Sequence, residues 1–337
     1  MPKLQLSFIS AFNERVDPLM KGAVQAEGIE IVPTYSHPSE TFWRQLKFQE
    51  YEVGEMSMSS YLIARERGFD IVALPVFPSR RLFHTELSYN TDSGIRQPSD
   101  LVGKRIGVGE YQQTAALWQR GILEHDFGVS QYKVHWYMER TEELSHGGAT
   151  GFTPPAGISF QRIPPDKSMA SMLVNNELDA AAINSPWQNM ASFIGRSHRI
   201  PGSDGDWNKV KLLFSDRMAE GARFFKKWEF LPVNHAYTIR GDIYKKYPWV
   251  AFNLYTGFVK AKEAFNAKLV DSIPSALFFG REYLAMTQGL FGNDPYPYGV
   301  KANRKMLETL IDFSHEQGLT AKKMKVEELF PASTLDL

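Results

Sequence analysis

Hydrophobic and polar positions follow strand and helix periods along the N-terminal part of the chain. Leu4–Ile9 alternates apolar and polar side chains and predicts a strand, as does Ile29–Thr34. Pro18–Glu27 lies between them, ends before Gly28 and predicts a helix. The uninterrupted apolar run Ile71–Pro75 predicts a further strand, of the buried type. This alternation of strands and helices indicates the α/β class.

The alternation continues beyond Pro98, with a mainly helical C-terminal third. Glu55–Ser60 predicts a polar loop, and Gly147–Pro165, with four Gly and four Pro, predicts a loop or lid. The other expected elements are strands at Ile106–Val108, Val134–Tyr137 and Ala180–Ile183, and helices through Ala115, Leu117 and Trp118 and through Met169, Met172 and Leu173.

The length of 337 residues exceeds one typical core and predicts two domains. The change of character near residue 98 favours a discontinuous division. Residues 1–90 and 215–337 form lobe I, and residues 91–214 form lobe II. Each lobe is expected to be a mixed sheet flanked by helices. Two crossings of the chain between the lobes would make a hinge, with the ligand in a cleft between them.

Composition excludes several classes of function. Lys and Arg number 38, as do Asp and Glu, so no charge excess favours nucleic acid or a membrane. The chain has no Cys, which excludes disulfides, thiolate nucleophiles and Cys-ligated metal centres. Metal-binding and nucleotide-binding motifs are absent from the sequence, so neither a metal nor a cofactor is expected. Without a signal-peptide pattern or a membrane-spanning run, a soluble cytoplasmic protein is the expectation.

Charged side chains follow the apolar strand that starts at Ile71. The run LPVFPSRRLFHTE leaves this strand through a turn that presents Arg80, Arg81, His84 and Glu86. Guanidinium groups bind carboxylates in a bidentate manner, so Arg80 and Arg81 are candidates to bind a small anion. An isolated Arg pair is more often solvated, and one of these two also has Glu86 as an alternative partner. A strand end, however, is the usual place of a site in an open α/β sheet.

Amide and hydroxyl groups follow a second strand. Gln112, Gln113 and Thr114 open the helix after Arg105–Val108, where free N–H groups favour an anion. The remaining substrate-binding candidates are Ser57, Ser59, Ser60, Arg15, Asn184 and Trp187. For the three serines the alternative is a role as helix caps, and for Trp187 it is a place in the core instead of a stacking contact with an aromatic ring.

Five segments carry a resemblance to a known family. They are LPVFPSRRLFH, DLVGKRIGVGEYQQTAALWQRGIL, NNELDAAAINSP, LPVNHAYTIRGDIYKKYPWV and NDPYPYGVKANRKMLETLIDF. Their order and spacing resemble the 4,5-dihydroxyphthalate decarboxylase family, from about residue 4 to the C-terminus. That family is similar in fold to type 2 periplasmic binding proteins. The resemblance implies a two-lobed fold of this type, and the conversion of 4,5-dihydroxyphthalate to protocatechuate and CO2 without a cofactor.

Such a reaction requires an anchored carboxylate, a general acid for the ipso carbon and an acceptor for a phenolic proton. His235, in LPVNHAY, is the preferred acid because it follows an expected crossing between lobes and an imidazole titrates near neutral pH. A structural role is the alternative for any one of the eight His. His84 is the second candidate. Glu110 is the candidate acceptor, although a Glu at a helix start also favours the helix dipole.

Two other functions fit the same residues. A solute-binding protein for an aromatic carboxylate needs no acid and is normally exported. Another small-molecule lyase on the same scaffold, like the enzymes that act on chorismate-derived intermediates in menaquinone synthesis, differs only in its substrate. The aromatic residues in Phe224–Phe230 and Tyr283–Tyr298 fit either a homo-oligomer contact or core packing.

Overall fold

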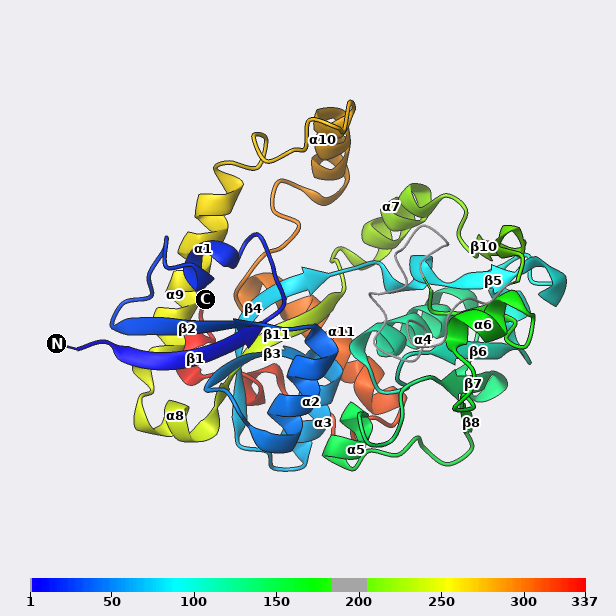
Figure 1. Ribbon diagram of the computed structural model, residues 1–337, viewed down its shortest axis with the longest axis horizontal. Helices are drawn as coiled ribbons and strands as arrows, with labels where there is room; N and C mark the ends of the chain where they lie inside the picture. Colours follow the sequence, from blue (N-terminus) through cyan, green and yellow to red (C-terminus); the bar gives the residue numbers. More distant parts are fainter. Residues whose placement is uncertain (1, 184–204) are drawn as a thin grey trace. The chain divides into compact units, whose positions relative to one another are not determined.

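The computed structural model describes residues 2–183 and 205–337, and the chain forms two compact units (Figure 1). Unit 1 contains Met1–Arg81, Phe225–Thr309 and Met324–Leu337, and unit 2 contains Leu82–Phe224 and Leu310–Lys323. The sequence predicted crossings near residues 90 and 215. In the structure these crossings follow Arg81 and Phe224, and Leu310–Lys323 makes a further return to unit 2.

Unit 1 is built on a mixed five-stranded sheet in the order β2-β1-β3-β11-β4. Strand β1 is parallel to β2 and β3, while β11 is antiparallel to both β3 and β4. The carboxyl ends of β1, β3 and β4 therefore meet at one edge of the sheet, beside the start of β11. The elements are β1 (Leu4–Ser10), α1 (Asp17–Met20), β2 (Ile29–Tyr35), α2 (Pro38–Phe48), β3 (Val53–Ser57), α3 (Met58–Glu66), β4 (Ile71–Arg80), β11 (Val233–Arg240), α8 (Gly241–Lys246), α9 (Trp249–Asn266) and α10 (Gly280–Phe291).

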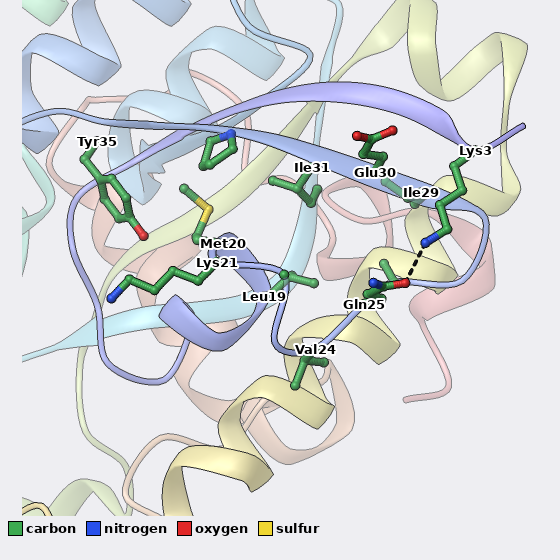
Figure 2. Close-up of a pocket in the computed structure, with 13 residues that line it drawn as sticks. Lys3, Leu19, Met20, Lys21, Val24, Gln25, Ile29, Glu30, Ile31 and Tyr35 are labelled. Atoms are coloured by element: carbon green, nitrogen blue, oxygen red, sulfur yellow. Dashed lines mark hydrogen bonds between the residues drawn. The ribbon is translucent and has the colours of Figure 1, made fainter.

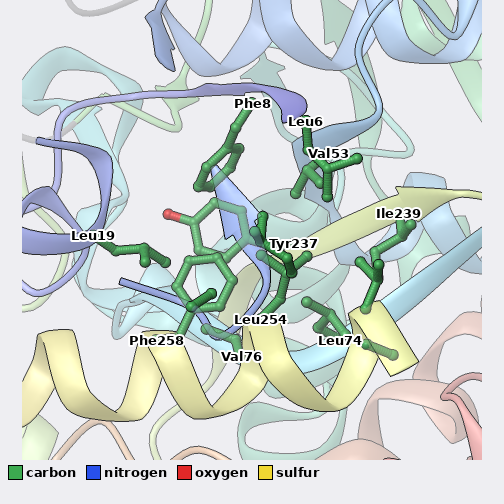
Figure 3. Close-up of a cluster of buried hydrophobic side chains, with 14 of the residues drawn as sticks. Leu6, Phe8, Leu19, Val53, Leu74, Val76, Tyr237, Ile239, Leu254 and Phe258 are labelled. Carbon is green, nitrogen blue, oxygen red and sulfur yellow. The ribbon is translucent and has the colours of Figure 1, made fainter. Parts of the chain in front are cut away.

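The core of unit 1 lies between this sheet and helix α9 (Figure 3). The ring of Tyr237 stacks on Phe258 with centroids 4.7 Å apart, and Phe8 meets Tyr237 edge-on at 5.0 Å. All three side chains are buried, and each buried ring stabilises the fold by about 1.5–3 kcal/mol. This packing holds the Tyr237 hydroxyl at the end of β1, where it meets Ser10.

Unit 2 is built on a mixed six-stranded sheet in the order β10-β5-β9-β6-β7-β8. Strands β9, β6, β7 and β8 are parallel, and β5 is antiparallel to both of its neighbours. Helix α6 packs on this sheet through Met169 and Leu173. The elements are β5 (Ser88–Asn90), β6 (Arg105–Val108), α4 (Thr114–Phe127), β7 (His135–Met138), α5 (His146–Thr150), β8 (Ser159–Arg162), α6 (Met169–Val174), β9 (Ala180–Ala181) and β10 (Val210–Leu212).

Helix α7 (Arg217–Trp228) contains the boundary between the two units after Phe224, and α11 (Arg304–Glu316) contains the boundary after Thr309.

The α/β class and the mixed sheets expected from the sequence are confirmed. No helix in the described ranges combines the length and the apolar character needed to span a bilayer.

Four predictions of local structure are wrong. The turn expected after Ile71–Pro75 is part of β4, which runs on to Arg80 and pairs with β11. Glu55–Ser60 is not a loop, because β3 runs to Ser57 and pairs with β11, which satisfies its backbone. The helix predicted at Pro18–Glu27 ends at Met20, and Gly22 follows with a φ of 74° that terminates it. The predicted loop Gly147–Pro165 contains most of α5 and all of β8, and its four prolines lie outside both elements.

The aromatic residues in Phe224–Phe230 and Tyr283–Tyr298 divide into buried and exposed ones. Phe224, Phe230 and Tyr298 are buried. Tyr283 is 62% exposed, near Leu277–Phe279, where Phe278 is 90% exposed. A homo-oligomer stays a prediction.

Candidate functional site

Buried polar side chains gather where the parallel strands of unit 1 end. Ser10 ends β1, Glu55 lies near the end of β3, and Arg80 ends β4. His235 lies at the start of β11, paired with Ser57 on β3 and with Ser79 on β4. Ligands of open α/β sheets bind at this edge, beyond the carboxyl ends of the strands.

His235 and Glu55 form a buried pair. Nδ1 of His235 lies 2.6 Å from Oε1 of Glu55, and the ring of Phe42 packs edge-on at 4.7 Å. Because Nδ1 donates to the carboxylate, Nε2 is the nitrogen that remains for other partners. It has no hydrogen-bond partner among the described residues, and the His235 side chain is 11% exposed. The pair can therefore hold a proton on Nε2 and deliver it to a ligand.

A hydrogen-bond network holds the second oxygen of Glu55. Oε2 accepts from the Ala11 N–H at 2.9 Å and from Ser10 Oγ at 3.2 Å, and Ser10 Oγ lies 3.1 Å from the Tyr237 hydroxyl. Burial acts to raise the pKa of Glu55, but attraction to His235 and these hydrogen bonds outweigh it, so the pKa lies below its ordinary value. Burial and the Glu55 charge hold the pKa of Tyr237 well above 10. Glu55 is thus a carboxylate and Tyr237 a neutral phenol at neutral pH.

The lowered pKa of Glu55 predicts a pH-dependent stability. Its contribution to the free energy of unfolding is complete above the ordinary pKa of 4.5 and is lost as the pH falls through the folded-state pKa. We expect Glu55→Gln to cost about 1–3 kcal/mol at neutral pH. The difference from wild type should shrink as the pH drops below 4.5. Urea unfolding of both proteins between about pH 3 and pH 7 measures it, and a pH-independent difference would contradict an ionised Glu55.

The arginines of unit 1 have different environments. Arg80 is 6% exposed, and it donates to the Leu231 and Pro297 carbonyls at 2.9 Å each and to Asn303 Oδ1. Burial lowers the pKa of Arg80 to about 10. Arg81 is exposed, and its backbone N–H donates to the Pro232 carbonyl. The geometry thus separates the predicted pair into a buried and an exposed arginine.

Arg15 is the third arginine candidate of unit 1. Its Nη2 donates to the Pro78 carbonyl at 2.8 Å, close to the end of β4. Its guanidinium lies 3.7 Å above the ring of Tyr296. Arg15 is also one of the charged neighbours of Arg80. The two arginines therefore belong to one cationic group in this unit.

The three candidate serines lie at the start of α3 and are buried. Ser57 is the N-cap residue, and its Oγ lies 3.4 Å from Oγ of Ser59. Oγ of Ser60 is buried and has no hydrogen-bond partner among the described residues. Because Ser57 pairs with His235, this helix start lies beside the His235–Glu55 pair, and its N–H groups favour an anion there.

Glu110 in unit 2 is fully buried and heavily bonded. Its carboxylate accepts from Arg140 Nη1 at 2.8 Å, from the backbone N–H of His146, and from the side chains of Ser145 and Gln112. Burial acts to raise the pKa of Glu110, but attraction to His146 and Arg140 and the hydrogen bonds outweigh it, so the pKa lies below its ordinary value. These contacts tie the end of β6 to the start of α5. Their number favours a positioning role for Glu110 over proton transfer.

The other candidates of unit 2 lie in two places. Gln112, Gln113 and Thr114 open α4, with Gln113 as its N-cap residue. His84 is fully buried, with Nε2 2.7 Å from Glu220 Oε1 and its ring against Phe224. His84 therefore has the surroundings of a core histidine. Asn184 and Trp187 lie outside the described residues.

The sequence reasoning missed the partners of His235. Glu55, which pairs with it, was not a candidate because it was assigned to a loop, and Ser10 and Tyr237, which complete the network around Glu55, were not candidates either. The one available signal was a lone charged residue between apolar neighbours in Val53–Ser57, which is unusual for a buried strand.

A pocket of about 420 Å³ lies beside the edge strand β2 (Figure 2). None of the candidate residues lines it, and its lining has one carboxylate, Glu30, and no histidine. It offers no acid–base pair. Among residues 2–183 and 205–337, no three His, Asp or Glu side chains group as metal ligands, and the expectation that no metal is required stays a prediction.

The sequence is similar to one family of binding proteins and to two proteins named as decarboxylases. Residues 10–192 match the family described as "ABC transporter, phosphonate, periplasmic substrate-binding protein". A Comamonas testosteroni protein named 4,5-dihydroxyphthalate decarboxylase is 30% identical over 339 residues, which cover 100% of this chain and 99% of that protein. A Pseudomonas putida protein of the same name is 37% identical over 181 residues, 53% of this chain and 70% of that protein.

Solved structures with a similar fold include two sulphonate-binding proteins. The periplasmic aliphatic sulphonate binding protein SsuA from Escherichia coli has a TM-score of 0.54 and 14% identity, over 100% of both chains. The alkanesulfonate-binding protein SsuA from Xanthomonas axonopodis pv. citri, bound to MOPS, has a TM-score of 0.53 and 13% identity, over 98% of both chains. These similarities confirm the predicted periplasmic-binding-protein-like fold.

Proposed function

Because the chain belongs to the 4,5-dihydroxyphthalate decarboxylase family, we propose that it converts 4,5-dihydroxyphthalate to protocatechuate and CO2. The family consists of carboxy-lyases, and the similarity to the Comamonas protein extends over the whole chain. The structural observation that carries the proposal is the buried His235–Glu55 pair, with Nε2 unpartnered at the ligand edge of the unit 1 sheet. A binding protein has no need of such a proton donor.

In the proposed reaction, protonated His235 transfers its Nε2 proton to the ring carbon that bears the departing carboxylate. The hydroxyl para to that carbon donates electron density to the ring, which loses its aromaticity for the lifetime of the intermediate. The bond to the carboxylate then breaks, its electron pair restores the aromatic ring, and CO2 leaves as a neutral molecule. Glu55 holds Nδ1 and stabilises the imidazolium, and solvent returns the proton to Nε2 afterwards.

The other candidates keep proposed binding roles. The start of α3, with Ser57, Ser59 and Ser60, supplies hydroxyl and N–H donors beside His235. Gln112, Gln113 and Thr114 are proposed ligands from the start of α4. Glu110 remains a hypothesis as the acceptor of the phenolic proton, and its contacts support a positioning role instead.

The alternative is a solute-binding protein for an aromatic carboxylate. The match of residues 10–192 to a family of substrate-binding proteins favours it. Such a protein would bind the dicarboxylate and release it unchanged.

Incubation of chelator-treated protein with 4,5-dihydroxyphthalate tests the proposal directly. We expect CO2 and protocatechuate in equal amounts, at a rate that added divalent metal leaves unchanged. A thermal shift with the compound but no product would reject the decarboxylase in favour of the binding protein or a lyase for a related acid. Recovery of turnover only with added metal would reject the metal-free mechanism.

A further inference from the structure

Two arginines of unit 1 lie near each other without an acidic partner. The hydrogen bonds of Arg15 and Arg80 go to uncharged acceptors, and neither side chain forms an ion pair among the described residues. Asp294, an acidic neighbour of Arg80, is bound by Lys262 at 2.6 Å. Positive charges held away from water are costly unless an anion accompanies them. The cationic group is therefore incomplete without a negatively charged ligand.

Buried donors without partners gather at the same place. Nε of Arg15, Nε of Arg80 and the hydroxyl of Tyr298 are buried and have no hydrogen-bond acceptor among the described residues, and the Tyr298 oxygen interacts with the Arg15 guanidinium. Tyr298 is 7% exposed, and its charged neighbours are Arg15, Asp294 and Arg80. Buried polar groups in proteins are nearly always bonded, so three exceptions together indicate a missing acceptor.

The donors of Arg15 and Tyr298 are suited to a carboxylate. The Arg15 guanidinium donates to the Pro78 carbonyl through Nη2 and interacts with the Tyr298 hydroxyl, and the side chain is half-buried, so a ligand can approach it. Burial raises the pKa of Tyr298 to about 12, so its hydroxyl keeps its proton at neutral pH and can donate. A guanidinium and a phenol side by side offer donors to both oxygens of a carboxylate.

We propose that Arg15, Arg80 and Tyr298 form a carboxylate-binding site, the Arg15 site, which holds the carboxylate that the product retains. Arg15 and Tyr298 donate to its oxygens, and buried Arg80 contributes positive charge. This inference rests on the proposed function for the identity of the ligand. It makes Tyr298 a specificity-determining residue for aromatic acids with two adjacent carboxylates.

The Arg15 site is continuous with the His235–Glu55 pair. The Tyr237 hydroxyl has Arg15 and Tyr298 among its electrostatic neighbours and meets Ser10, which donates to Glu55. A phthalate ring anchored through one carboxylate would thus present the adjacent ring carbon, with the departing carboxylate, toward His235. An acid with a single carboxylate can occupy the Arg15 site, but it then has no second carboxylate on the ring carbon that faces His235.

Phthalate is a suitable probe, because it has both carboxylates but no hydroxyl group to support decarboxylation. We expect Arg15→Met to weaken phthalate binding by about 10- to 100-fold and Tyr298→Phe by about tenfold, measured by calorimetry. Arg65→Met is the matched control. Arg65 is also half-buried in unit 1 and also donates to backbone carbonyls, and its replacement should leave phthalate binding unchanged.

Tyr298→Phe keeps the test valid if Arg15→Met fails to fold. It removes a buried hydroxyl whose proton has no acceptor, so the melting temperature of the unliganded protein should stay close to that of wild type. Weaker binding with unimpaired stability supports the Arg15 site. Wild-type phthalate binding by Tyr298→Phe overturns the role of Tyr298, and wild-type binding by folded Arg15→Met overturns the site.

Failure of the Arg15 site is distinguishable from failure of the proposed function. If wild-type protein does not decarboxylate 4,5-dihydroxyphthalate but its phthalate binding depends on Arg15, the Arg15 site is supported and the proposed activity is rejected. If Arg15→Met decarboxylates 4,5-dihydroxyphthalate with an unchanged KM, the Arg15 site is rejected and the proposed activity is supported.

Discussion

His235→Gln is expected to lower kcat for 4,5-dihydroxyphthalate by about 10²- to 10⁴-fold, while phthalate binds within a few-fold of wild type. The imidazole is the proposed proton donor, and its Nδ1 is held by Glu55 at 2.6 Å. Glutamine keeps a polar group next to Glu55 but has no titratable proton to deliver. Turnover measured by CO2 release, with phthalate affinity measured in parallel, separates lost chemistry from lost binding.

His125→Gln is the matched control for this experiment. His125 also pairs with a glutamate, at 2.8 Å from Glu316, but it lies in unit 2 with a side chain 39% exposed. Its replacement should leave kcat unchanged. If His235→Gln retains kcat within threefold of wild type, roughly 0.6 kcal/mol, the proton comes from another group. His84 would then become the first residue to test.

Glu110→Ala is expected to destabilise the protein by about 3–5 kcal/mol. The change removes the carboxylate that binds the buried Arg140 guanidinium and the backbone N–H of His146 at the start of α5. Since most of these contacts lie within one loop and the end of β6, we expect the loss to appear in the unfolding of unit 2. Urea unfolding at neutral pH measures it.

Glu142→Ala is the control in the same loop. The side chain of Glu142 is 78% exposed and lies 3.9 Å from Arg162, so its removal should change stability by less than about 0.5 kcal/mol. A stable Glu110→Ala variant with a kcat reduced more than about 100-fold would contradict the positioning role and support proton transfer by this carboxylate.

Local patterns were sufficient to predict much of the architecture. In Leu4–Ile9 and Ile29–Thr34 the alternation of apolar and polar side chains is visible in neighbouring residues. The two segments lie in β1 and β2, respectively. The prediction for Glu55–Ser60 failed because small hydroxyl side chains are typical of a loop, whereas the strand that ends at Ser57 is held by its pairing with β11. Hydrogen bonds with a segment about 180 residues away in sequence leave no trace in local composition.

The sequence by itself determined the α/β class, the candidate proton donor His235 and the candidate anion-binding residue Arg80. Only the tertiary structure decided what these groups bind. The antiparallel register of β3 and β11 brings Glu55 to His235, and Arg80 reaches acceptors at Leu231, Pro297 and Asn303, 151 to 223 residues away. A side chain's charge and reach belong to its type, but its partner depends on which distant backbone the sheet places beside it.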